Sequence, residues 1–106
     1  MRLVVRPEAE ADIAAAFAWY ERSRAGLGHR LVHEAERVFD SIRDEPLRFP
    51  LAGRTARRAL LRRFPYAVLF VFHEPVVTIL AVMHMARKPG VWTSRARDSN
   101  ASPKDE

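Results

Sequence analysis

His84 and several arginines are the residues whose chemistry stands out in this sequence. Cleavage of RNA through its 2′-hydroxyl group needs a base, an acid and cations that hold the phosphate charge. His84 is a candidate acid or base, and Arg62, Arg63 and Arg87 are candidates for the phosphate contacts. A guanidinium group suits that task because it binds two phosphate oxygens at once. One hypothesis is therefore a nuclease site built on His84, Arg63 and Arg87.

A structural role for His84 is the favoured alternative. The residue closes a predicted strand, where its ring is expected to bond a backbone carbonyl. The acids that could complete a nuclease site are poorly placed, because Glu45 and Glu74 each stand beside a proline where an element ends. The catalytic set for RNA cleavage is therefore incomplete in this sequence.

A cluster of arginines lies before and within the first strand of the predicted hairpin sheet, at 58–64, and basic and aromatic residues follow the last strand. The cluster consists of Arg54, Arg57, Arg58, Arg62 and Arg63. It predicts docking to RNA or to an acidic protein surface, or else protection of an edge strand by charge. Arg87 and Lys88 extend the basic surface, and Trp92 is expected either to stack on a base or to cover the sheet.

The charge of the chain is unevenly distributed. The 106 residues carry a net charge of +5, with −1 on residues 1–52 and +6 on residues 53–106. A half this basic favours a polyanionic or acidic partner, or serves solubility. No apolar run approaches the roughly 18 residues of a membrane span, and the N-terminus has no signal core. These features predict a cytoplasmic protein with no membrane association.

Cofactor and metal sites are not expected. The chain has no cysteine, and His29 and His33, four residues apart on a predicted helix, lack a third ligand at a suitable spacing. Gly26 and Gly28 are not a phosphate loop, because no strand precedes them and no Gly-Lys-Ser/Thr follows.

The elements that must position these residues give an α+β fold. An N-terminal strand and a helical hairpin are predicted to pack on a small antiparallel sheet, followed by a basic C-terminal segment. One domain spans residues 1–97, and residues 98–106 are predicted to be a disordered tail. Apolar periodicity predicts a strand at 1–6, helices at 7–23 and 28–45, and strands at 58–64, 66–73 and 76–84.

The predicted sheet is apolar on both faces. The helical hairpin can cover only one of these faces. Strict alternation along the last two strands makes Leu69, Val71, Ile79 and Met83 the candidates for the uncovered face. The uncovered face needs the C-terminal segment, a second copy or a partner chain as its cover. It is therefore a candidate protein-binding surface.

Short motifs occur along the chain in the same order as these elements. They are Ala-Asp-Ile at 11–13, Trp-Tyr-Glu at 19–21, Gly-Leu-Gly at 26–28, Arg-Arg at 57–58, Arg-Phe-Pro-Tyr at 63–66, Ala-Val-Met-His at 81–84 and Arg-Lys-Pro at 87–89. Over about residues 1–95 the sequence resembles the RelE/ParE superfamily of toxins from bacterial type II toxin–antitoxin modules, often called plasmid stabilisation proteins.

The resemblance implies a growth-inhibiting toxin held inactive in a hetero-oligomer with its antitoxin, which would bind over Leu69, Val71, Ile79 and Met83. ParE-like relatives inhibit DNA gyrase without being enzymes, and RelE-like relatives cleave messenger RNA on the ribosome. Nuclease members commonly have a lysine-rich segment or a Glu base and a C-terminal Tyr, which this chain lacks. The sequence therefore favours gyrase inhibition. A ribosome-dependent ribonuclease and a non-toxic binding module remain the alternatives.

Overall fold

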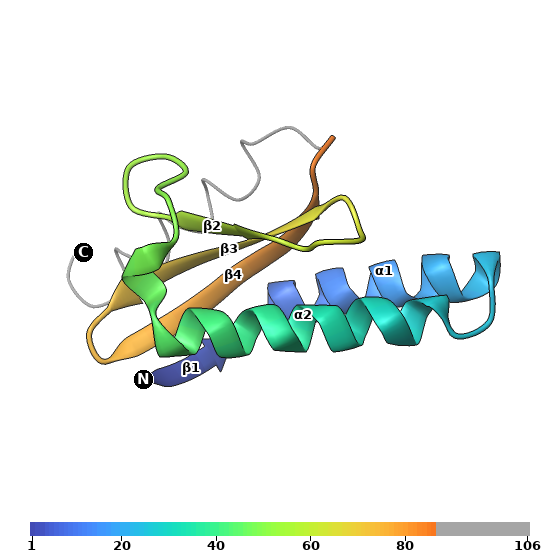
Figure 1. Ribbon diagram of the computed structural model, residues 1–106, viewed down its shortest axis with the longest axis horizontal. Helices are drawn as coiled ribbons and strands as arrows, with labels where there is room; N and C mark the ends of the chain where they lie inside the picture. The colour runs from blue at the N-terminus through green and yellow to red at the C-terminus, as the bar shows by residue number, and fades with distance from the viewer. Residues whose placement is uncertain (87–106) are drawn as a thin grey trace.

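The described residues, 1–86 of the computed structural model, form two helices and a four-stranded sheet (Figure 1). The predicted α+β class is confirmed, and the helical hairpin lies along one face of the sheet. In chain order the elements are β1 (Arg2–Val5), α1 (Pro7–Ser23), α2 (Leu27–Asp44), a 3-10 turn (Pro46–Arg48), β2 (Arg57–Leu60), β3 (Tyr66–His73) and β4 (Val76–His84).

The first helix, α1, begins and ends where its sequence predicts. Pro7 occupies the first turn, where a proline costs no hydrogen bond, and Glu8 and Glu10 lie near the positive end of the helix dipole. Ala9 and Ala16 are buried. These small side chains allow α1 to approach β4 closely.

The turn between α1 and α2 depends on a carboxylate and two glycines. Gly26 has a φ of 91°, a left-handed conformation that favours glycine. The Glu21 carboxylate accepts hydrogen bonds from the backbone N–H groups of Gly26 at 2.8 Å and Gly28 at 2.9 Å. The bond from Gly26 is the main reason why the pKa of Glu21 lies below its ordinary value of 4.5. At Gly28 a Cβ atom would lie 2.5 Å from the Phe17 carbonyl oxygen, so the helices require glycine there.

The main core lies between the helices and the sheet. Leu31 and Ile42 of α2 are fully buried against Phe70 of β3 and Ile79 of β4. Full burial of one such side chain stabilises the fold by about 1.5–3 kcal/mol. This packing fixes the position of α2 over the sheet and therefore fixes which helix residues face β2.

The sheet is mixed rather than purely antiparallel. Its order is β1-β4-β3-β2, and β1 pairs with β4 in parallel. The ladder between them ends where the Arg6 N–H bonds the Ile79 carbonyl. Beyond that point Asp12 of α1 accepts the Val82 N–H at 3.0 Å. A helix carboxylate thus satisfies the edge of β4 where β1 has ended.

The strand predicted at 58–64 is shorter and begins earlier, at Arg57–Leu60. The ladder to β3 closes where the Leu61 N–H bonds the Tyr66 carbonyl, so the chain turns back over residues 61–65. Pro65 within this turn has no N–H to continue a ladder. Arg62 and Arg63 consequently belong to the turn and do not alternate across a strand.

A β-bulge changes the faces of β4. Leu69 pairs with Ala81 and Phe70 pairs with Ile79, which leaves Leu80 as the extra residue. Ile79 therefore packs in the helix-side core, whereas Met83 lies in the cluster on the opposite face. The expectation that strict alternation extends through both residues is wrong, because the bulge inverts the alternation between them.

No helix within residues 1–86 has the length and apolar character that a membrane crossing requires. The predicted division of the chain at residue 97, and the tail that follows it, lie outside the described residues.

Candidate functional site

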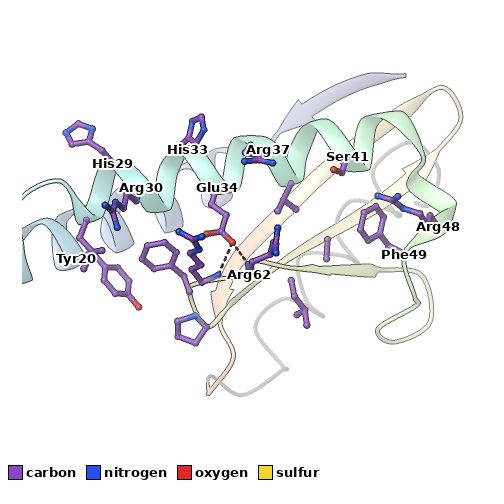
Figure 2. Close-up of a pocket in the computed structure, with 17 residues that line it drawn as sticks. Tyr20, His29, Arg30, His33, Glu34, Arg37, Ser41, Arg48, Phe49 and Arg62 are labelled. Carbon is purple, nitrogen blue, oxygen red and sulfur yellow. Dashed lines mark hydrogen bonds between the residues drawn. The ribbon is translucent and has the colours of Figure 1, made fainter.

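A groove of about 1110 Å³ runs between α2 and the β2 end of the sheet (Figure 2). One wall is the polar face of α2 from Leu27 to Ser41. The opposite wall is formed by the end of β2 and the turn at residues 61–65, and Phe49 lies beyond the end of α2. The groove exists because the core packing holds α2 over one face of the sheet, and because the chain leaves β2 after Leu60 and turns toward α2 over residues 61–65.

The groove is strongly basic. Five arginines line it, and Glu34 is the one acidic residue among its described lining residues. His29 and His33 lie at its rim, and His29 packs edge-on against Phe17 with ring centroids 4.9 Å apart. The arginines come from both walls and from the 3-10 turn: Arg30, Arg37, Arg48, Arg62 and Arg63.

Apolar side chains lie among these charges. Val38 of α2 and Phe49 after the 3-10 turn both line the groove, and both are partly exposed. Phe49 packs at right angles to buried Phe70, and the Arg48 guanidinium lies 4.9 Å from the Phe49 ring centroid. A surface that combines exposed apolar side chains with cations can bind an amphipathic, acidic ligand.

Glu34 connects the two walls. Its Oε2 atom accepts the backbone N–H groups of both Arg62 and Arg63, the latter at 3.0 Å. In Figure 2 the Glu34 side chain points from α2 toward Arg62, with dashed lines to these amides. A single carboxylate thus anchors the turn after β2 to the helix above it.

The predicted arginine cluster divides in the structure. Arg62 and Arg63 line the groove, whereas Arg57 and Arg58 do not. The Arg57 guanidinium donates a 2.7 Å hydrogen bond to the Phe49 carbonyl and so holds the loop before β2. Arg58 is exposed on that strand, opposite Leu69 of β3.

The predicted catalytic group does not assemble among the described residues. His84 lies opposite Tyr66 in the sheet, with the ring centroids 5.3 Å apart. Its Nδ1 atom accepts the Ala86 N–H at 3.1 Å, which places the ring proton of a neutral His84 on Nε2. The ring thus terminates β4 through an N–H rather than through the expected carbonyl. Arg87, Lys88 and Trp92 lie outside the described residues.

Three of the four predicted antitoxin contacts lie together on the sheet face away from the helices. Leu69, Val71 and Met83 expose 4% of their surface or less, and Ala52 and Ala56 from the loop before β2 pack with them. Ile79 lies on the other face of the sheet. Leu69, Val71 and Met83 share one face, and their role in binding the antitoxin stays a prediction.

Sequence reasoning missed the α2 wall of the groove. Arg30, Glu34, Arg37 and Ser41 recur at intervals of four, three and four residues, which places them on one helical stripe. That spacing is visible in the sequence. It does not by itself indicate a site, because only the tertiary fold shows that the stripe faces β2.

The fold and the basic groove define the chain as a RelE/ParE-type toxin. The family profile described as "ParE toxin of type II toxin-antitoxin system, parDE" matches residues 3–89, so the chain belongs to the ParE toxin family. A solved structure described as "Chromosomal ParDE TA system from P. aeruginosa" has a TM-score of 0.72 at 18% identity, and the match covers 79% of this chain and 95% of that chain. No curated protein sequence matches this chain.

Proposed function

We propose that this toxin acts in the cytoplasm by inhibiting DNA gyrase through binding alone, and that an antitoxin holds it inactive in a hetero-oligomer. Membership of the ParE family supports the toxin–antitoxin assignment. The observation that carries the non-enzymatic mechanism is the position of His84.

His84 is poorly placed to act as a general acid or base. Its Nδ1 atom is occupied by the Ala86 N–H, and its ring packs against Tyr66. Arg63, the predicted phosphate contact, lines the groove together with Glu34, and His84 does not line it. Within residues 1–86 the Glu34 carboxylate already accepts two backbone amides, so it is a weak candidate for the missing base.

The groove is the proposed docking site for the antitoxin. Its five arginines complement an acidic segment, and Val38 and Phe49 offer contacts for apolar side chains of the same segment. Charge complementarity of this kind raises the association rate and selects against basic competitors. The apolar face around Leu69, Val71 and Met83 is a second proposed contact for the antitoxin.

The dimensions of the groove favour a compact segment. The α2 wall from Leu27 to Ser41 is about 21 Å long at 1.5 Å per residue. The outer edge of β2 is already partly paired, because the Arg58 N–H bonds the Pro50 carbonyl at 3.0 Å and Leu51 pairs with Arg57. An added strand would meet this loop, so a helical segment of about fourteen residues fits better.

A supercoiling assay with purified gyrase tests the proposed mechanism. The wild-type chain should inhibit supercoiling, and His84→Asn should inhibit it equally, because Asn keeps an acceptor for the Ala86 N–H but cannot titrate. His84→Ala controls for the loss of that acceptor. His73→Ala, at the opposite end of β3, controls for the removal of a histidine elsewhere.

Translating ribosomes supply the opposing test. If the wild-type chain cleaves ribosome-bound messenger RNA and both His84 variants abolish cleavage while gyrase is unaffected, the RelE-like alternative is correct and the gyrase mechanism is wrong. If the chain inhibits neither target, the non-toxic binding module is correct.

A further inference from the structure

Glu34 is an unexpected residue in this groove. It is the one acid among the described lining residues, and it stands where the proposed partner would bring negative charge of its own. Removing a like charge from a binding surface should strengthen attraction to an acidic ligand. The presence of this carboxylate therefore needs an explanation other than charge.

The hydrogen bonds of Glu34 supply that explanation. The carboxylate reaches across 28 and 29 residues of sequence to the amides of Arg62 and Arg63. These are consecutive residues in a turn that has left the β2–β3 ladder. Leu61 and Phe64 on either side are buried in the core, but Arg62 and Arg63 are exposed, so packing does not fix the backbone between these two anchors. Charge-assisted bonds from one carboxylate to two amides fix its position instead.

We propose that Glu34 is a positioning residue that presets the groove for its acidic partner. By holding the two amides it fixes the backbone from which the Arg62 and Arg63 side chains extend. They then lie across the groove from Arg30 and Arg37, which stand four residues before and three residues after Glu34 on α2. This inference rests on the groove being the docking site.

Preorganisation predicts that removing Glu34 weakens binding of the acidic partner, whereas simple electrostatics predicts that it strengthens binding. Without Glu34 the exposed Arg62–Arg63 stretch must be ordered at the moment of binding, and each side chain ordered on binding reduces affinity. For two arginines the expected loss is about tenfold. Charge alone predicts a gain of a few-fold from the same substitution, because one like charge is removed.

Titration calorimetry at low salt, with the full chain and a poly-L-glutamate peptide of about fifteen residues, measures whether the Glu34 variants bind more weakly or more tightly than wild type. Glu34→Ala is expected to bind about tenfold more weakly than wild type, and Glu34→Gln, which keeps an acceptor oxygen, should recover part of that loss. Glu36→Gln removes the same charge from an exposed, non-lining position on α2 and should not weaken binding. Tighter binding by both Glu34 variants would overturn the proposal.

Amide NMR separates positioning from general destabilisation. In Glu34→Ala the Arg62 and Arg63 amide resonances should shift upfield and exchange faster, while the β3 and β4 amides keep their wild-type positions. Unchanged Arg62 and Arg63 resonances would contradict the proposal. If Glu34→Ala does not fold, Glu34→Gln carries the same comparison, with smaller shifts at the same two amides.

Charge reversal distinguishes failure of this inference from failure of the docking site. Arg62→Glu with Arg63→Glu should abolish peptide binding if the groove is the site. If the double variant binds like wild type, the groove is not the docking site and the role of Glu34 in it fails as well. If the double variant does not bind but Glu34→Gln and Glu34→Ala bind more tightly than wild type, the groove is the docking site and only the positioning role of Glu34 is wrong.

Discussion

Two glutamates in this molecule use the same chemistry in two regions and produce different structures. Glu21 accepts the amides of Gly26 and Gly28, five and seven residues away, and so closes the turn between the helices. Glu34 accepts the amides of Arg62 and Arg63, 28 and 29 residues away, and so joins α2 to the sheet. The local bonds build a turn, whereas the long-range bonds build one wall of a groove.

We expect the burial of the amides, more than the number of bonds, to decide what each carboxylate contributes to stability. Asp12 provides the third case, because it accepts the amide of Val82, a residue that is 2% exposed. An amide at the surface regains water when its acceptor is removed, whereas a buried amide does not. The expected order of effects on stability follows from this difference.

The largest loss of stability is expected at Gly28, where the turn held by Glu21 brings α1 and α2 into contact. Gly28→Val places a side chain against the Phe17 backbone, where even a Cβ atom would lie 2.5 Å from the carbonyl oxygen. We expect a loss of about 3 kcal/mol in the free energy of unfolding, measured by urea denaturation. Gly26→Ala, which meets no atom within 4 Å but has a φ of 91°, should lose only about 1 kcal/mol. Equal losses would mean that the close helix approach is not what requires Gly28.

The buried amide gives the next effect. Asp12→Ala leaves the Val82 N–H without its acceptor, and we expect a loss of about 2 kcal/mol by the same denaturation. Glu10→Ala, an exposed change on the same helix, should lose less than about 1 kcal/mol, through the helix dipole alone. A loss at Asp12 no larger than the loss at Glu10 would contradict the ranking by burial.

Glu34→Ala should have a smaller effect on stability than on binding. Arg62 and Arg63 are exposed, so water replaces the carboxylate, and we expect a loss of about 1 kcal/mol. Denaturation of Glu34→Ala beside Asp12→Ala measures this difference. A loss at Glu34 larger than that at Asp12 would show that the turn contributes more to the fold than its exposure indicates.

The smallest effect is expected at Glu21, and it should depend on pH. The bond from Gly26 holds the pKa of Glu21 in the folded chain below its ordinary value of 4.5. Its stabilisation is therefore complete above pH 4.5 and is lost as the pH falls through the lower, folded value. The difference in Tm between wild type and Glu21→Gln should shrink as the pH is lowered from 6 to 3. A difference that stays constant would show that the Glu21 charge does not hold the turn.

Local patterns predicted much of the fold. The first helix and the last two strands begin and end at the predicted residues, because their periodicity and their flanking prolines are local signals. The same local logic failed at Ile79, because a bulge depends on how two strands pair. It also failed for the parallel pairing of β1 with β4, which joins opposite ends of the described chain.

The groove was only half predictable. Arg62 and Arg63 were identified from charge, whereas Arg30, Glu34 and Arg37 on α2 were not. Whether a polar stripe on a helix faces water or a second wall depends on the rotation of that helix over the sheet. The buried residues Leu31 and Ile42 set that rotation through contacts far away in the sequence.

The most direct test of the proposed function is pulse-labelling of DNA and protein synthesis in bacteria after induction of the wild-type chain. Inhibition of gyrase predicts that DNA synthesis falls first, together with DNA-damage signalling, while protein synthesis continues. If protein synthesis falls first and messenger RNAs are truncated, the gyrase mechanism is wrong and the ribonuclease alternative takes its place.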